Sequence, residues 1–347
     1  MSKLLRHSLV FAAVFVLNGT SRAWDYEGHR LVNQLALAAL PAEFPAFVKS
    51  PQAQERIAFL AGEPDRWRNV PDYSLRHFNG PDHYIDLEEL ADYGLDASSL
   101  PKFRYQFAGL LANARAKNPG NFTPIDPAQN EDHTRELVGF LPWTLTEFYG
   151  KLKSSFSYLK AFEQEGTPDE IANAQQDIIY IMGVMGHFAG DATQPLHTTK
   201  HFNGWVGDNP KHYATNRTFH SWIDGGYMRR MGGLTVADLQ SQLRPAHSLT
   251  SVNPATKQDE MFSVILKFLV EENKLVEPLY QLNKDGSLSD NGEPGSKGRT
   301  FMSAQIAKGG MLLADIWFTA WQNAPADAFL KGRLLERKTG SRRGAPR

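Results

Sequence analysis

The sequence has no cysteine and few of the alternating patterns that are typical of strands. Without cysteine the chain can form no disulfide and no thiolate metal site, so any metal would be bound by nitrogen and oxygen. The scarcity of alternation argues against a β protein. The 37 basic and 38 acidic side chains give a formal charge of -1, which excludes a strongly basic protein that binds nucleic acid by charge alone.

Long hydrophobic runs are also missing. The longest, 9–17, is far shorter than the roughly 20 residues that span a membrane. Lys3 and Arg6 precede this run, and small residues at 21 and 23 follow it, which predicts a secretory signal over residues 1–23. An N-terminal membrane anchor is the alternative. We therefore expect a secreted or periplasmic protein without stable membrane association, and no obligate protein partner is evident.

Helical patterns dominate the remainder of the chain. They predict helices near 30–40, 99–117, 135–162, 167–192, 259–282 and 300–322. No linker divides them, so the prediction is one all-α, single-domain helical bundle over residues 24–325. A basic tail, 326–347, is predicted to be disordered, with a nucleic-acid-binding arm as the alternative. Without residues 1–23 and the basic residues 331–347, the chain carries 27 basic and 37 acidic side chains, a formal charge of -10.

The most informative segment is 187–197. On a helix, His187 and Asp191 lie four residues apart and share one face, as metal-chelating residues do. Pro195 should end this helix before His197, which places that histidine in the following loop, where it can serve a different ion. Nearby small residues should let another element approach this helix closely; they are Gly183, Gly186, Ala189 and Gly190.

A second histidine and carboxylate pair has the same spacing, His220 and Asp224. A single pair is usually a surface hydrogen bond, but two pairs with His197 between them favour a metal site. Upstream lie further ligand types, each of which also has a plain structural interpretation: His29 as an exposed side chain, Asp65 as a helix cap and His83 as a core histidine. Together the five histidines and three aspartates suit several zinc ions.

These residues resemble one known family. The chain has Trp24, then Gly28-His29, Pro64-Asp65, His83-Tyr84-Ile85-Asp86, the pattern HxxGDxxQPLH over 187–197, and His220-x3-Asp224. This order is similar to that of the S1/P1 nucleases, which share their fold with zinc-dependent phospholipase C. The resemblance spans about 200 residues and implies the helical fold of that superfamily.

The resemblance implies three zinc ions per chain. The first would be held by Asp65, His83, His187 and Asp191. The second would share Asp191 and be held by His29 and by the amino nitrogen and carbonyl oxygen of Trp24. The third would be held by His197, His220 and Asp224. The family pattern also gives Asp65 a catalytic role in orienting the attacking hydroxide, Arg68 a phosphate-clamping role, and Tyr84 and Asp86 contacts with a base; core packing is the alternative for Tyr84.

The implied function is a secreted zinc endonuclease, a hydrolase that cleaves single-stranded DNA and RNA to 5'-phosphate products, with 3'-nucleotidase activity as a further expectation. A zinc-dependent phospholipase C is the alternative, and a noncatalytic zinc-binding module is a third hypothesis. The sequence departs from the family at the loop 203–209, where the eukaryotic nucleases carry Gly-Gly-Asn, and in its lack of disulfides.

Overall fold

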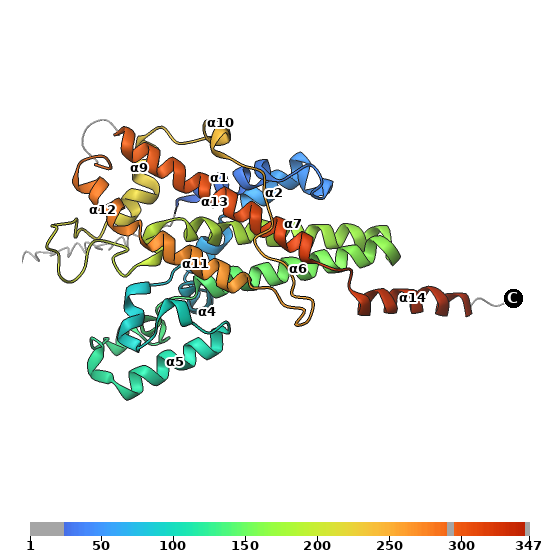
Figure 1. The fold of residues 1–347 in the computed structure, drawn as a ribbon, viewed down its shortest axis with the longest axis horizontal. Coiled ribbons are helices and arrows are strands. Elements are labelled where there is room, and N and C mark those ends of the chain that lie inside the picture. Colours follow the sequence, from blue (N-terminus) through green and yellow to red (C-terminus); the bar gives the residue numbers. More distant parts are fainter. Residues whose placement is uncertain (1–23, 290–294, 344–347) are drawn as a thin grey trace, which may run out of the picture.

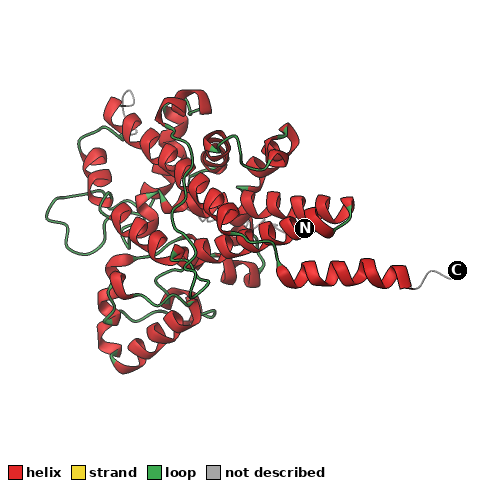
Figure 2. Cartoon of the chain, turned by 45° about the vertical axis from the view of Figure 1, so that its right-hand side comes forward, coloured by secondary structure: helices red, strands yellow, loops and turns green. Residues whose placement is uncertain are grey.

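Helices make up the architecture of the chain. A computed structural model describes residues 24–289 and 295–343, and no strand occurs within these ranges apart from one isolated bridge between Phe202 and Gly204. Figure 2 shows helices joined by loops throughout. The all-α prediction is therefore confirmed. The predicted signal, 1–23, lies outside the described residues.

Four long or central helices form the bundle. They are α1 (Tyr26–Ala39), α6 (Leu141–Glu165), α7 (Pro168–Ala192) and α13 (Ser296–Asn323), and each packs against at least two of the others. In Figure 1, α6 and α7 lie side by side and α13 crosses them. The last turns of α7 are buried completely, so the centre of the bundle lies where the sequence places its first metal-ligand pair.

Small residues determine how closely the neighbours of α7 approach. A Cβ on Gly183 would lie 2.6 Å from the Leu60 side chain on α2 (Pro51–Leu60), and one on Gly186 would lie 1.5 Å from Oδ1 of Asn33 on α1. The close approach predicted from the small residues is thus present. It puts the backbones of α1 and α2 against the face of α7 that carries the candidate ligands.

The start of α7 agrees with the sequence. Thr167 and Glu170 form a capping box, which satisfies the backbone N–H groups of these two residues, and Pro168, which has no N–H, occupies the first turn. The helix ends at Ala192, and Pro195 begins the 3-10 turn Pro195–Thr198. His197 therefore lies after the helix, as its position relative to Pro195 indicates.

Smaller elements surround the bundle. A lobe on one side contains α4 (Tyr73–Asn79), α5 (Arg104–Lys117) and short 3-10 turns, as Figure 1 shows. Beyond the lobe are the remaining helices: α3 (Glu63–Asn69), α8 (Phe219–Ser221), α9 (Tyr227–Arg230), α10 (Val236–Leu239), α11 (Met261–Asn273) and α12 (Val276–Lys284). The helix expected over 259–282 is thus two helices, and the one expected from 99 begins at Arg104.

The C-terminal segment differs from its prediction. The disorder expected for residues 326–347 is wrong for most of that range, because Ala328–Arg343 form helix α14. Arg337 makes a two-bond ion pair with Glu170 at 2.7 and 2.9 Å, and Leu334 is buried. These contacts hold α14 against the end of α6 and the start of α7. The prediction of a solvated tail considered only the charges of this segment. Within the described ranges, no helix has the length and apolar content needed to cross a membrane.

Candidate metal centre

The predicted ligands on α7 lie at the buried end of that helix. His187 and Asp191 are both completely buried, and Nε2 of the histidine lies 3.4 Å from Oδ2 of the aspartate. Nδ1 of His187 is 2.8 Å from the carbonyl oxygen of Ala61, to which it donates when protonated. That bond leaves the lone pair of Nε2 directed toward Asp191, which is the arrangement of a metal-binding histidine.

Two further predicted ligands converge on the same point from other elements. His83 ends the 3-10 turn Pro81–His83, and its Nδ1 lies 2.9 Å from Oδ2 of Asp191 and 3.0 Å from Nε2 of His187. Asp65, in α3, places Oδ1 3.8 Å from Nε2 of His187. Three of the four residues expected at the first ion, Asp65, His83 and His187, have ligand atoms within 4.8 Å of one another.

A second group shares the α7 residues. His29 on α1 stacks on His187 with ring centroids 3.8 Å apart, and its Nε2 lies 3.6 Å from Oδ1 of Asp191. The glycine at 190 permits this contact, because a Cβ there would lie 2.6 Å from Nδ1 of His29. Trp24 is buried beside them and its indole N–H donates to the Gly190 carbonyl at 3.0 Å. The indole thus fixes Trp24 beside this group; a ligand role for its backbone stays a prediction.

The third group is formed by His197, His220 and Asp224, as the sequence predicts. Nδ1 of His197 is 2.6 Å from the carbonyl oxygen of His83, so its Nε2 faces Nε2 of His220 at 3.1 Å. Nε2 of His220 is 2.8 Å from Oδ2 of Asp224. The three groups are neighbours, because Nδ1 of His197 also lies 3.7 Å from Oδ1 of Asp191.

The backbone at the third group is less regular than the sequence suggests. Asp224 lies in a single π-helical turn, Trp222–Gly226, that follows α8. Such turns are frequent at functional sites because they redirect a side chain. The glycine at 226 accommodates this turn, since a Cβ there would lie 2.4 Å from the Trp222 ring. The spacing of four was sufficient to find the pair, but not to predict this geometry.

Burial decides the protonation of these groups. It lowers the pKa of His83, His187 and His197 well below the usual histidine value, and the charge of Arg68 lowers it further. The pKa of His220 falls to about 3 for the same two reasons. The histidines are therefore neutral at neutral pH, and neutral imidazole is the form that binds metal.

The carboxylates respond in the opposite direction. Burial raises the pKa of Asp191 and Asp224 well above the usual value. Neither Oδ1 of Asp191 nor Nε2 of His83 takes part in a hydrogen bond with any described residue. Buried polar atoms without partners are costly unless an ion binds them. The donor set of imidazole nitrogen and carboxylate oxygen thus fits zinc, and it includes no group that zinc would reject.

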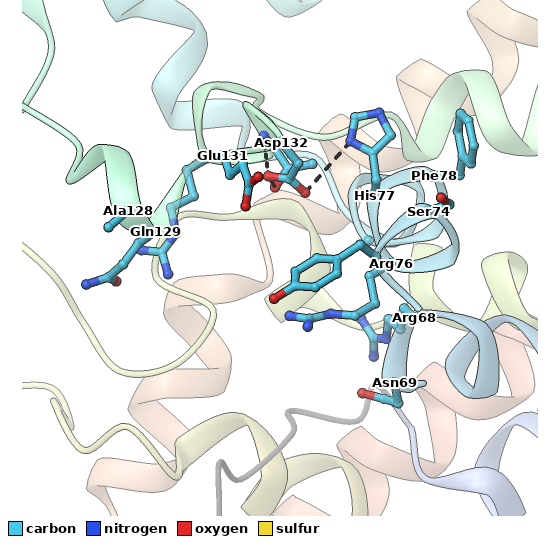
Figure 3. Close-up of a pocket in the computed structure, with 14 residues that line it drawn as sticks. Arg68, Asn69, Ser74, Arg76, His77, Phe78, Ala128, Gln129, Glu131 and Asp132 are labelled. Atoms are coloured by element: carbon cyan, nitrogen blue, oxygen red, sulfur yellow. Dashed lines mark hydrogen bonds and ion pairs between the residues drawn. The ribbon is translucent and has the colours of Figure 1, made fainter. Parts of the chain in front are cut away.

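Arg68 lies beside this centre. Its Nη2 is 2.6 Å from Oδ1 of Asp65, one turn back on α3, and the side chains of both residues are largely buried. The guanidinium also borders a cleft of about 970 Å³ between α4 and the segment 128–135. Figure 3 shows Arg68 and Arg76 on one side of this cleft and Gln129 on the other. Arg68 therefore lies between the cleft and the candidate metal centre, whose His and Asp groups do not themselves line the cleft.

Tyr84 and Asp86 belong to none of the three groups and do not line this cleft. Tyr84 packs against Gly139, where a Cβ would lie 2.0 Å from the tyrosine carbonyl oxygen and where φ is 94°. Asp86 is buried; this burial, followed by the charges of Glu89 and Glu88, raises its pKa well above the usual value. Their contacts with a base stay predictions.

One partner of the third group was missed from the sequence. Gln194 is buried, and its side-chain amide donates to Oδ1 of Asp224 at 2.6 Å. The same side chain accepts from the backbone N–H of Leu196 at 3.3 Å. Its place in the HxxGDxxQPLH pattern was a usable signal, because polar residues inside a ligand motif often orient a ligand.

Comparison with known proteins adds little to this picture. No protein-family model matches the chain, and neither does any curated protein. Among solved structures, the alpha-toxin of Clostridium perfringens, isolated from avian strain SWCP, is similar over 88% of this chain and 65% of the toxin chain, with 12% identity and a TM-score of 0.36. This chain thus spans slightly less than two thirds of the toxin's length. The likeness is too distant to indicate an activity.

Proposed function

We propose that the protein is a zinc-dependent hydrolase of phosphodiester bonds. The observation that carries this proposal is the convergence of three largely buried His and Asp groups next to Arg68, which also lines a cleft. A structural zinc site normally closes around one ion with four ligands, whereas two of these groups share His187 and Arg68 beside them lines a cleft. Their proximity suits a cluster that acts on a substrate.

The residues around the centre support phosphate chemistry. Zinc, when bound, would stabilise the charge that develops on a phosphate and make a water molecule acidic enough to attack it. The carboxylate of Asp65 can orient that water and holds Arg68 in place through their 2.6 Å contact. The planar guanidinium of Arg68 matches the spacing of two phosphoryl oxygens and so favours a phosphate over other esters.

We propose single-stranded nucleic acid as the substrate and the space outside the cytoplasm as the place of action. The family resemblance of the HxxGDxxQPLH segment supports both, and so do the basic side chains along the cleft. Zinc phospholipase C is the second candidate. One observation favours it: Tyr73 and Phe78, on α4 near Arg68, are 75% and 68% exposed, and exposed aromatic rings also occur at lipid interfaces.

The experiment is a comparison of substrates with a matched variant. The zinc-loaded protein is incubated with single-stranded DNA, with phosphatidylcholine vesicles and with bis(p-nitrophenyl) phosphate. Asp191→Asn should abolish every hydrolysis that the protein performs, because a neutral amide is a poor bridging ligand, while circular dichroism stays helical. Hydrolysis of none of the three phosphodiesters by the zinc-loaded protein would refute the proposal.

The proposal extends to Trp24. If its α-amino group is a ligand, the second group is complete only after residues 1–23 are removed, because an amide nitrogen has no basic lone pair to donate. The protein that begins at Trp24 should then bind more zinc than one that retains preceding residues. Equal zinc content and equal turnover would show that Trp24 acts only through its buried indole.

A further inference from the structure

Helix α4 contributes nothing to the core. None of its residues is buried, and the side chains of Tyr73 and Phe78 are largely exposed. Both rings line the cleft beside Arg68, where an exposed aromatic side chain can contact a ligand. Three residues separate α4 from α3, which carries Asp65 and Arg68, and Arg68 lines the same cleft as α4.

The cleft that α4 borders carries more arginine than acidic side chains. Arg68, Arg76 and Arg135 line it. Among the described residues, neither Arg76 nor Arg135 forms an ion pair with a carboxylate, although Glu131 and Asp132 also line the cleft. Asp132 lies 3.7 Å from the ring of His77, and Figure 3 shows this pair away from Arg68.

The aromatic and cationic groups are arranged together. The guanidinium of Arg76 lies 5.7 Å from the centroid of the Tyr73 ring. Single-stranded nucleic acid is bound by this combination, in which aromatic rings stack on bases and basic side chains follow the phosphates. The volume of about 970 Å³ also exceeds what one phosphate group at the metal centre would need.

We propose that this cleft binds the nucleotides that flank the scissile phosphate of a single strand, with Tyr73 stacked on a base and Arg76 and Arg135 in contact with neighbouring phosphates. The inference rests on the proposed nuclease function and adds to it a binding subsite separate from the metal ligands. A phospholipid fits less well, because its head group has one phosphodiester and offers no second phosphate to the outer arginines.

The subsite gives a physical reason for selecting single strands. Tyr73 can stack only on a base whose face is exposed, whereas in a duplex both faces are covered by neighbouring bases. A substrate longer than a dinucleotide should therefore gain affinity from the cleft, and a small phosphodiester should not. Chain length becomes the variable that reports on the cleft.

The test compares two substrates for each variant. The first is a single-stranded oligothymidylate of about 12 nucleotides, within the site sizes of single-strand binders, and the second is bis(p-nitrophenyl) phosphate. For Tyr73→Ala, the ratio of kcat/KM for the oligonucleotide to kcat/KM for the small substrate should fall about tenfold, mainly through KM. Arg76→Gln should lower the same ratio and reduce the slope of log KM against log salt by about 0.7.

Matched controls exist on the same molecule. Arg56 lies 5.6 Å from the ring of the exposed Phe59, much as Arg76 lies over Tyr73, but on α2. Tyr158 is a 46% exposed tyrosine on α6 that lines a different hollow. Arg56→Gln and Tyr158→Ala should keep the wild-type ratio and salt slope. Zinc content is measured for every variant to exclude damage to the metal centre.

The outcomes separate the cleft from the proposed function. If the wild-type protein cleaves the oligonucleotide and both cleft variants keep its ratio and salt slope, the cleft inference is overturned while the nuclease function stands. If the wild-type protein hydrolyses bis(p-nitrophenyl) phosphate and phosphatidylcholine vesicles but not the oligonucleotide, the nuclease function and the cleft inference both fall. A loss that is equal for the two substrates would also overturn the cleft inference.

Discussion

The contact between Gln194 and Asp224 gives the sharpest prediction about the third group. Replacing Gln194 by leucine keeps a buried side chain of similar size but removes the amide that donates to Oδ1 of Asp224 at 2.6 Å. The carboxylate then loses the group that fixes its direction. We expect the third ion to be bound more weakly while the fold persists.

The magnitude follows from two independent estimates. A hydrogen bond to a charged group contributes about 1.5–3 kcal/mol. Loss of a partner that orients a metal ligand typically weakens metal binding about 10- to 100-fold, which corresponds to about 1.4–2.8 kcal/mol. The estimates agree, so Gln194→Leu should weaken the third ion by about 10- to 100-fold.

The assay is a zinc titration against a competing chelator, read by metal analysis. Thr198→Val is the control, because Thr198 is equally buried and its hydroxyl donates to the Pro195 carbonyl at 2.8 Å, within the same 3-10 turn. Thr198→Val should lower the free energy of unfolding and leave the zinc affinities unchanged. Retention of every zinc ion at wild-type affinity in Gln194→Leu would refute the orienting role.

Four further predictions concern other parts of the molecule. A chelator should lower the melting temperature, because zinc binds the folded ligand set in preference to the unfolded chain; a calorimetric scan that does not shift would contradict it. Arg68→Ala should retain its zinc and lose about 100- to 1,000-fold in kcat/KM, and unchanged kinetics would reject the phosphate contact. Gly186→Ala should lower the free energy of unfolding by about 1–3 kcal/mol, because the added Cβ would lie 1.5 Å from Oδ1 of Asn33. Urea denaturation measures this change. Gly150→Ala is the control that should not destabilise the protein, because nothing lies within 4 Å of a Cβ at that position. The hydrogen bond from Arg337 on α14 lowers the pKa of Glu170 to about 2. The docking of α14 should therefore be intact above the ordinary glutamate pKa and be lost as the pH falls through about 2. Hydrogen exchange of the α14 amides measures this docking, and protection that does not change with pH would contradict the prediction.

Sequence patterns predicted correctly those features of the structure that depend on residues close together in the sequence. The start of α7 follows from Thr167, Pro168 and Glu170, since each acts on backbone groups within one turn. The pairs His187/Asp191 and His220/Asp224 followed from spacing, because residues four apart on a helix share a face, whereas the assignment of ligands to three ions was implied by the family resemblance. The close packing around Gly186 was also foreseeable, since only a residue without Cβ permits it.

Features that depend on distant contacts were not foreseeable in this way. Helix α14 forms where the composition suggested disorder, and its bonds to Glu170 join residues 167 positions apart. The π turn at Asp224 depends on the packing of the Trp222 ring. The cleft beside α4 was missed because its walls, α4 and the segment 128–135, lie far apart in the sequence and neither carries a motif.

The candidate metal centre also has a consequence for how the chain reaches its native state. The contacts that assemble it are long-range: His83 and Asp191 are 108 positions apart, and Trp24 and Gly190 are 166 apart. Closing loops of this length is an entropic cost that precedes any reward from the contact. Zinc would therefore bind late, after the bundle has formed, and would slow unfolding more than it accelerates folding. A protein without disulfides would then resist unfolding through the long lifetime of its native state.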